Sequence, residues 1–354
     1  MKIMNKKRCK QIKTLLEKIP GNILWWIWLV IMGVCYFVAP TILSYIDVDI
    51  VQKFLNTVKN FKNNNISIDI FIKAVTATLV ILIIVRIVIE CLLRYKYNCR
   101  KLKLIEHMSL NHMAISIDSS VEDNYEIEPV VINLVSEMEA GEIPYAIRKQ
   151  DSEVINVKNY LRDKNVKEEY GYSGIAHTPL IYRMGYQLGD ETSFDLLHKR
   201  RNEGTFKVLS SKGVRYTIGS QEEKIVTGSN KLLVAVSTTT DIIDVDLIDF
   251  DLNTMNFIKF KSDDLGFDVI DSKDKVDGYA YSIMKYIEEK VKEWHITEVH
   301  MVISSSVGLT FALGQATREN CVPNLVVYNY KDGRYPWGIR IYEMNTNCLV
   351  KWDN

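Results

Sequence analysis

The feature that most constrains the fold is an internal repeat in the second half of the chain. The segment YSGIAHTPLIYRMGYQLG, which begins at Tyr172, has a counterpart in MVISSSVGLTFALGQATR, which begins at Met301. The offset stays at 129 residues without a gap up to Phe206. Five anchors match along it: Leu180 with Leu309, Gly185 with Gly314, Leu196 with Leu325, Gly204 with Gly333, and Phe206 with Tyr335. A duplicated structural unit explains this agreement better than chance does.

Each copy alternates strand-like and helix-like stretches. We predict a strand at Pro129–Leu134 in the first copy, with Lys231–Thr240 playing the same part in the second, and a further strand at Glu298–Ile303. The stretch Asp274–Trp294 predicts an amphipathic helix, since apolar residues recur at helical spacing: Ala280, Ile283, Met284, Ile287 and Val291. Such alternation implies βαβ units and a mostly parallel sheet. We therefore expect an α/β fold of two Rossmann-like subdomains, with halves at about 128–225 and 229–345.

The charge of the chain is divided unevenly between its two parts. Residues 1–103 carry 17 Lys and Arg against 5 Asp and Glu, whereas residues 104–354 carry 27 against 39. A basic N-terminal part indicates a membrane or polyanion role for that part. The acidic remainder is a poor partner for long nucleic acid, because phosphate neutralisation dominates such binding. A small anionic ligand needs only a local pocket and stays compatible with this balance.

A first membrane span is predicted at about 22–46. No charged side chain occurs from Ile19 to Ile46, and a span needs about 20 apolar residues. Three tryptophans, Trp25, Trp26 and Trp28, lie near one end of this run, as interfacial aromatic belts do. A cleaved signal peptide has a shorter apolar region, of about 7–15 residues, so we predict a true span.

A second span is predicted at about 70–93, although Lys73, Arg86 and Glu90 interrupt its apolar character. The two basic side chains can reach opposite interfaces. Glu90 lies four residues after Arg86 and four before Arg94, so one helical face can pair these charges. Arg86 and Glu90 are either simple interface anchors or charged elements of an oligomeric pore.

The flanks of the two spans predict their orientation. Basic residues dominate MKIMNKKRCKQIK before the first span and RYKYNCRKLK after the second. The segment Asp47–Asp69 between them has three positive and three negative charges. The positive-inside rule then places both termini in the cytoplasm. We expect a membrane hairpin in residues 1–103 and a cytoplasmic domain in 104–354.

Motifs of common enzymes and metal sites are missing from the sequence. There is no G-x-x-x-x-G-K-[ST], no H-E-x-x-H and no G-x-G-x-x-G after a strand. The stretch GYSGI is one residue short of a nucleophile elbow, and DSKDKVDG has the wrong carboxylate spacing for a calcium loop. The six cysteines form no C-x-x-C pair, which indicates reduced thiols. We therefore expect no enzyme activity, no metal and no cofactor.

Polar side chains follow two of the predicted strands in the second copy. Ser237, Thr238 and Thr239 follow one, and Ser304, Ser305 and Ser306 follow the other, directly before a helix. Ligands of α/β sheets bind beyond the carboxyl ends of the strands, and helix N-termini attract anions. Each serine is either such a donor or a helix N-cap.

The first copy offers different side chains at the same corner. Tyr172 could stack on a base, whereas His177 is either a ligand residue or simply the start of a helix. Lys199, Arg200 and Arg201 form the strongest basic cluster of an acidic domain, and they either neutralise a phosphate or form a solvated strand end. The predicted ligand residues are Tyr172, Ser173, His177, Arg183, Lys199, Arg200, Arg201, Ser237, Thr238, Thr239, Ser304, Ser305, Ser306, Thr310 and Tyr330.

At these residues the sequence resembles the SAVED domain family. The resemblance rests on GYSGIAHTPLIYRMGYQLGD, FDLLHKRR, KLLVAVSTTT and HMVISSSVGLTFALGQATREN with LVVYNYKDGRYPW, and covers roughly residues 128–343. It implies two fused CARF-like units that sense a cyclic di- or trinucleotide in CBASS anti-phage defence. Many family members have a proline near the helix start of the second half, where this chain has Gly308. The resemblance therefore does not predict the exact shape of that loop.

The resemblance also implies an effector function. Transmembrane SAVED effectors are thought to impair the bacterial inner membrane after ligand-driven homo-oligomerisation, so the lipid bilayer is a second expected partner. Two other functions stay open. One is a membrane-tethered sensor that recruits a partner without forming a pore, and the other is a membrane enzyme acting on a nucleoside or sugar phosphate.

Overall fold

The computed structural model describes residues 100–110, 115–162, 168–190, 192–199, 204–343 and 346–351. The chain divides into Met1–Asn98 and Cys99–Asn354, and every described residue belongs to the second unit. The two predicted spans, with Arg86 and Glu90, lie outside the described residues, as do Arg200 and Arg201. Among the helices that the structure describes, none combines the length and the apolar character needed to cross a bilayer.

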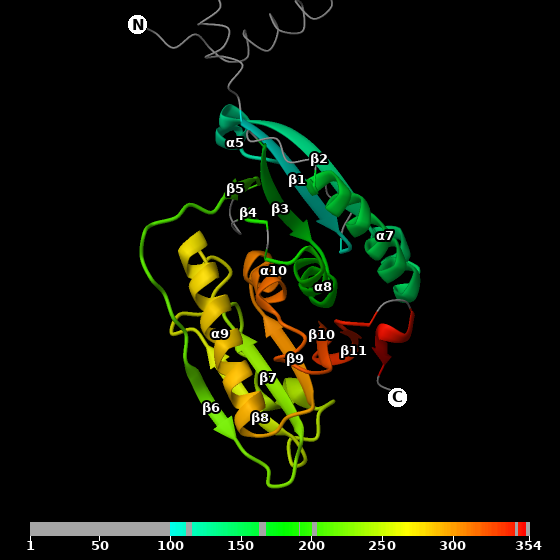
Figure 1. Ribbon diagram of the computed structural model, residues 1–354, viewed down its shortest axis with the longest axis vertical. Helices are drawn as coiled ribbons and strands as arrows, with labels where there is room; N and C mark the ends of the chain where they lie inside the picture. The colour runs from blue at the N-terminus through cyan, green and yellow to red at the C-terminus, as the bar shows by residue number, and fades with distance from the viewer. Residues whose placement is uncertain are drawn as a thin grey trace, which may run out of the picture. The chain divides into compact units, whose positions relative to one another are not determined.

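Sheet 1 has five strands in the order β2-β1-β3-β4-β5 (Figure 1). They are β1 Arg100–Met108, β2 Tyr125–Asn133, β3 Glu168–Ile175, β4 Phe194–Lys199 and β5 Phe206–Val208. The first four are parallel, and β5 returns antiparallel to β4. Its helices are α5 Ser119–Asn124, α6 Val135–Glu139, α7 Ile143–Arg162 and α8 Thr178–Leu188.

Sheet 2 has seven strands in the order β12-β11-β10-β9-β7-β8-β6. They are β6 Ser220–Lys224, β7 Lys231–Ser237, β8 Asn256–Lys261, β9 Glu298–Ser304, β10 Leu325–Lys331, β11 Arg334–Arg340 and β12 Leu349–Lys351. Its helices are α9 Lys273–Glu293 and α10 Val307–Ala316, with 3-10 turns η1 Asp244–Leu247 and η2 Thr346–Cys348. The predicted strands and the long amphipathic helix of this half are confirmed within a few residues.

The two halves share one topology, which confirms the predicted duplication. The order β2-β1-β3-β4-β5 recurs as β8-β7-β9-β10-β11, with the same parallel and antiparallel pairings. Met108 of β1 pairs with Ile175, and Ser237 of β7 pairs with Ser304. Ser237 lies 129 residues after Met108, and Ser304 lies 129 residues after Ile175. The repeat therefore extends back to β1.

One prediction about the repeat was wrong. The stretch Pro129–Leu134 falls mainly in β2, which corresponds to β8 and not to β7. The true counterpart of β7 is β1, which begins at Arg100 and was not predicted as a strand. Its lysines pair within the sheet, since Lys101 lies 2.6 Å from Glu128 and Lys103 lies 2.7 Å from Glu168.

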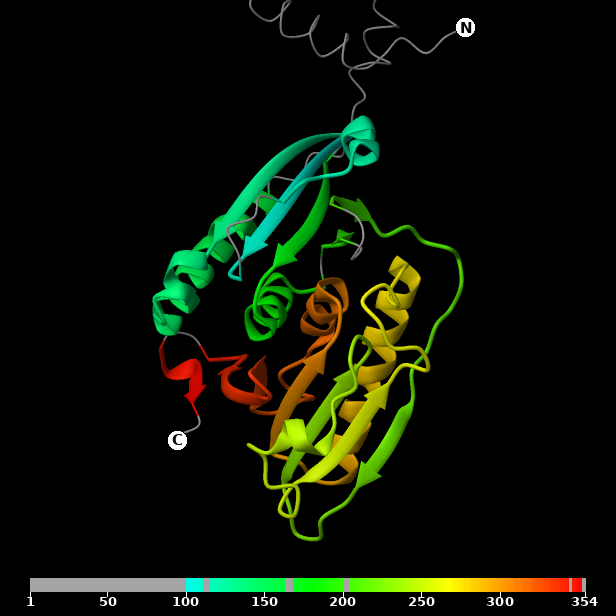
Figure 2. The same cartoon turned by 180° about the vertical axis from the view of Figure 1, so that it is seen from behind.

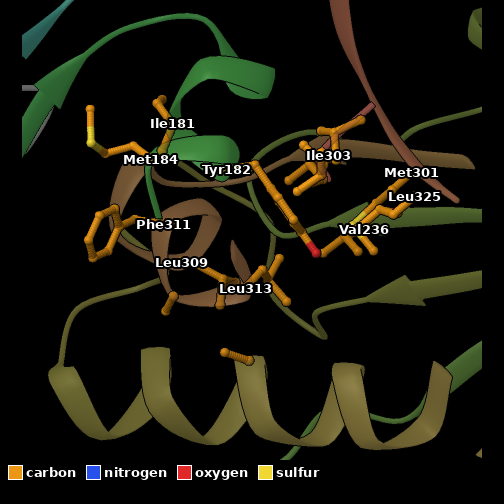
Figure 3. Close-up of a cluster of buried hydrophobic side chains, with 14 of the residues drawn as sticks. Ile181, Tyr182, Met184, Val236, Met301, Ile303, Leu309, Phe311, Leu313 and Leu325 are labelled. Atoms are coloured by element: carbon orange, nitrogen blue, oxygen red, sulfur yellow. The ribbon is translucent and has the colours of Figure 1, made fainter. Parts of the chain in front are cut away.

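A single hydrophobic core joins the two halves (Figure 3). It contains Tyr182 and Met184 of α8 together with Leu309 and Leu313 of α10 and Met301 of β9. A second cluster on the other face of sheet 2 includes Leu247, Phe250, Tyr328 and Tyr335, and the short turn η1 lies over this face (Figure 2). Because this core contains buried residues from both halves, its apolar burial stabilises the two halves together.

The helices α8 and α10 pack directly against each other between the sheets (Figure 1). A Cβ on Gly185 would collide with the main-chain oxygen of Phe311, and a Cβ on Gly314 would collide with that of Tyr182. Phe311 is the counterpart of Tyr182 at the offset of 129, so the crossing is symmetric. Each helix also reaches the opposite half, since α8 contacts β10 and β11 while α10 contacts β3 and β4.

Candidate functional site

The carboxyl ends of the parallel strands from both halves meet near the two central helices. A Cβ on Gly174, near the end of β3, would lie 3.4 Å from Val307 at the start of α10. The ring of His177, just before α8, lies 5.8 Å from that of Trp337 in β11. Each strand-to-helix corner therefore borders the opposite half. The two corners form one composite surface, where α/β sheets bind their ligands.

The first corner is organised by Ser109 and His177. The backbone N–H of His177 donates to Ser109 Oγ at 2.8 Å, and Oγ lies 2.8 Å from His177 Nδ1. Burial, and secondly the charge of Lys331, lower the pKa of His177 to about 4. The imidazole is therefore neutral at pH 7, and it offers a hydrogen bond and no charge.

The second corner is built from the serines after β9. Ser306 is the N-cap of α10, and its Oγ accepts the N–H of Leu309 at 3.3 Å. Ser305 Oγ accepts from the Thr238 hydroxyl at 2.9 Å, and Ser304 Oγ accepts the N–H of Thr240 at 3.1 Å. Ser304 and Ser305 are half-buried, whereas Ser306 is buried. The solvent therefore reaches the first two serines of the triplet.

The two corners also have equivalent backbone hydrogen bonds. Ser109 N–H and Leu110 N–H both donate to the carbonyl oxygen of Ile175, at 3.0 and 3.2 Å. Thr238 N–H and Thr239 N–H both donate to that of Ser304, at 2.8 and 3.0 Å. Thr238 is thus the counterpart of Ser109, and Ser306 is the counterpart of His177.

Arg183 was predicted as a ligand residue, but the structure places it in the interior. Its side chain is 0% exposed, and it binds Asp151 through two hydrogen bonds of 2.9 Å. It also donates to the carbonyl oxygens of Arg340 and Ile341. The guanidinium thus joins α7, α8 and the end of β11, and it is not exposed at the composite surface.

Tyr172 and Ser173 also face inward from β3. The ring of Tyr172 stacks on Phe311 with centroids 3.9 Å apart, and its hydroxyl lies 2.9 Å from His107 Nδ1. The Ser173 hydroxyl donates to the carbonyl oxygen of Ile105. Both residues are almost wholly buried, so the expectation that Tyr172 stacks on a base finds no support in this arrangement.

The other predicted residues divide between supporting and accessible positions. Ser237 and Thr310 are buried, since the Ser237 hydroxyl accepts the N–H of Ile242 and the Thr310 hydroxyl donates to the carbonyl oxygen of Ser306. Thr239 and Lys199 are half-buried at their strand ends. Tyr330 is exposed, and its hydroxyl donates to Asp246 at 3.0 Å. The structure therefore brings His177, Thr239, Ser304 and Ser305 to the composite surface.

Sequence reasoning missed three residues of the first corner. Ser109 holds His177, Trp337 packs on its ring, and Lys331 carries an exposed charge close enough to lower its pKa. A signal for Ser109 was present, because counting 129 residues back from Thr238 gives Ser109. Lys331 and Trp337 come from the opposite half, which no sequence pattern of the first half indicates.

The composite surface is rich in hydroxyl and N–H donors and poor in acid–base groups. No group of three His, Cys, Asp or Glu residues within the described part of the chain could hold a metal ion. A pocket of about 640 Å³ lies elsewhere, between β4, α9 and α10. It mixes three basic with three acidic side chains, and none of the predicted ligand residues lines it. The donors of the composite surface suit phosphate oxygens and base edges.

These features define an α/β domain of two repeated units whose strand-to-helix corners meet at one composite surface. The family described as "SMODS-associated and fused to various effectors sensor domain", SAVED, matches residues 153–341. The chain belongs to the SAVED family. No curated protein matches it.

Several solved structures are similar to this chain. One is the Acinetobacter baumannii Cap4 SAVED/CARF-domain containing receptor with the cyclic trinucleotide 2'3'3'-cAAA, at 13% identity and a TM-score of 0.47. It covers 66% of this chain and 50% of that chain. The same receptor with 3'3'3'-cAAA has a TM-score of 0.46 at 12% identity, with the same coverage. The Moraxella osloensis Cap4 receptor has 13% identity and a TM-score of 0.40, covering 67% of this chain and 49% of that chain. The chain thus spans about half the length of these receptors.

Proposed function

We propose that this chain is a membrane-bound receptor for a cyclic oligonucleotide and acts as an effector of CBASS-type antiviral defence. The meeting of two strand-to-helix corners from opposite halves is the observation that carries this proposal. Gly174 packs beside Val307 and His177 beside Trp337, so one ligand can touch both halves. Donors without dense positive charge suit a compact ring of few phosphates better than long nucleic acid. The family's description as a sensor fused to effectors supports the same reading.

The effector part of the proposal rests on the N-terminal sequence. The uncharged run Ile19–Ile46 and the basic flanks around both predicted spans support a two-span hairpin in the bacterial inner membrane, with both termini in the cytoplasm. Ligand binding then promotes association of the SAVED domains, which clusters the hairpins and disrupts the membrane. A ligand can drive assembly only by its extra affinity for the assembled state.

A leakage assay tests the whole proposal. The full chain is reconstituted in dye-filled vesicles of bacterial lipid, and cyclic di- and trinucleotides are added, beginning with 2'3'3'-cAAA and 3'3'3'-cAAA. We expect dye release only with a cyclic ligand, together with a shift to larger assemblies on sizing. Absence of both binding and leakage with every cyclic nucleotide would overturn the proposal.

Two variants separate a membrane-disrupting effector from a tether that recruits a partner. Arg86→Gln and Glu90→Gln should keep ligand binding and lose leakage if these charges belong to the pore. Lys73→Gln is the matched control, because it removes a charge at the other end of the same predicted span. Ligand binding without any leakage by the unmodified chain would favour the tether.

A further inference from the structure

The hydrogen bonds of Ser109 determine which nitrogen of His177 carries the proton. A hydroxyl has one proton to donate and two lone pairs to accept with. Ser109 Oγ accepts the N–H of His177, so its contact with Nδ1 either donates the hydroxyl proton or accepts a second N–H. In the second case the hydroxyl proton would have no acceptor, because Ser109 is 2% exposed and makes no further side-chain hydrogen bond to the described residues.

A buried hydroxyl without an acceptor destabilises the fold, so the first arrangement is favoured. The Ser109 hydroxyl then donates to Nδ1, and the ring proton resides on Nε2. This Nε2–H forms no hydrogen bond to a described residue, and the ring around it is only partly buried. Ser109 thereby leaves His177 with one outward donor.

The opposite half supplies a positive charge whose field reaches His177. Lys331 lies at the end of β10, is exposed, and forms no ion pair with a described residue. Its charge is felt at His177, whose pKa it helps to lower. Burial contributes more to that shift, and His107 of β1 is the other titratable neighbour that couples to His177.

We propose that Ser109 sets the tautomer of His177 so that its Nε2–H, together with the Lys331 ammonium, binds one phosphoryl group of the ligand. This inference rests on the proposed function and gives the ligand surface a defined phosphate position. The second corner lacks it, since its counterparts of Ser109 and His177 are Thr238 and Ser306. The two corners therefore recognise different parts of the ligand.

Amide substitutions of His177 test the position of the donor. His177→Gln places an N–H near the position of Nε2, whereas His177→Asn places it near Nδ1. With 3'3'3'-cAAA and 2'3'3'-cAAA as probes on the full chain in detergent, we expect His177→Gln to bind within about 3-fold of the unmodified chain. We expect His177→Asn and Ser109→Ala to bind about 10-fold more weakly, the loss of one hydrogen bond to a charged group.

Lys331→Gln tests the charge, and Lys292→Gln on the exposed side of α9 is its control. Lys331→Gln should weaken binding about 10-fold at low salt and reduce its salt dependence, because a charged contact is screened. Lys292→Gln should leave the affinity unchanged. Equal affinities for the Gln and Asn variants of His177, or for Lys331→Gln and the unmodified chain, would overturn the inference.

The tautomer has a readout that does not need a ligand. In the full chain with nitrogen-15 histidine, the His177 ring should show protonated Nε2 and bare Nδ1, and Ser109→Ala should shift this pattern. Thermal unfolding shows whether each variant is folded. If the unmodified chain binds no cyclic nucleotide, the proposed function fails. If the spectrum shows Nε2 without a proton, the inference about Ser109 fails and the proposed function is not affected.

Discussion

Gly185 and Gly314 occupy equivalent places where α8 and α10 cross, and each leaves room for the main chain of the other helix. Because Gly185 has no side chain, the carbonyl of Phe311 fits against its main chain. The carbonyl of Tyr182 fits against Gly314 in the same way. Both obstacles are backbone atoms, which cannot swing aside as a side chain can. The repeated glycine in the sequence thus marks the contact point of the two halves.

Gly314→Ala should therefore destabilise the protein, although alanine is the better helix former. We expect a loss of about 2 kcal/mol or more, typical of a forced shift in a packed core. Gly308→Ala is the control, because its Cβ would meet Leu196 at an ordinary 3.5 Å. That variant should be neutral or more stable by about 0.5–1 kcal/mol. Equal unfolding free energies for the two variants in denaturant would contradict the tight crossing.

Removing Arg183 should unfold the protein more easily rather than weaken ligand binding selectively. Arg183→Met leaves the Asp151 carboxylate without its bidentate partner, and breaking a buried pair costs about 3–5 kcal/mol. Lys285→Ala removes one member of the exposed pair with Glu289 and should cost less than about 0.5 kcal/mol. Chemical denaturation measures both. An Arg183→Met protein of full stability with lost ligand affinity would return this residue to the ligand surface.

The serine triplet should separate into a cap and a ligand contact. Ser306→Ala removes the side-chain cap of α10 and should cost about 1 kcal/mol of stability. Ser305→Ala keeps that cap and should lower the affinity for a cyclic trinucleotide by about 5-fold, the loss of one hydrogen bond. Melting temperature and binding measured on the same samples test this division. The reverse pattern would show that Ser306 contacts the ligand.

The buried histidines predict a loss of stability in mild acid. Burial lowers the pKa of His107 to about 3 and that of His300 to about 4, whereas an unfolded histidine has a pKa of about 6.5. The unfolded chain therefore binds protons first as the pH falls. Stability is complete above about pH 6.5 and declines below it, by about 1.4 kcal/mol per pH unit for each histidine.

His177 should add to this slope, since its pKa is also lowered, first by burial and then by Lys331. Urea denaturation at pH 6.5 and pH 5.0 measures the difference in the free energy of unfolding. His107→Gln should reduce the pH dependence of the free energy of unfolding by the contribution of one histidine, because the amide does not titrate. A flat profile over this range would show that the rings are more exposed to water than the structure indicates.

The repeat predicted the topology of the fold well, while local patterns missed one central strand. The first four residues of RKLKLIEHM were assigned to the basic flank of a membrane span, but the stretch is a strand. Leu102 and Leu104 face the core, and the intervening Lys103 is neutralised by Glu168. Charge alone could not reveal this, because its partner lies 65 residues further along the chain.

The strands β7 and β9 that precede the candidate site were predicted correctly, but the burial of several candidate residues was not. Tyr172 and Arg183 have polar groups that the sequence leaves available for a ligand, yet both side chains are buried in the structure. Whether a side chain faces solvent depends on what the other half packs against it. Residues such as Lys331 and Trp337 reach the first corner only because the halves interlock.

Because α8 and α10 each contact the opposite half, the composite surface contains one corner from each half. Two identical chains paired about a twofold axis would present two identical corners. Here a single covalent chain contains both, so each corner has been free to change on its own. One now carries Ser109 and His177, and the other carries Thr238 and Ser306. Under the proposed function, these two unlike corners would contact different phosphodiester linkages of a cyclic ligand, a distinction that two identical corners would not make.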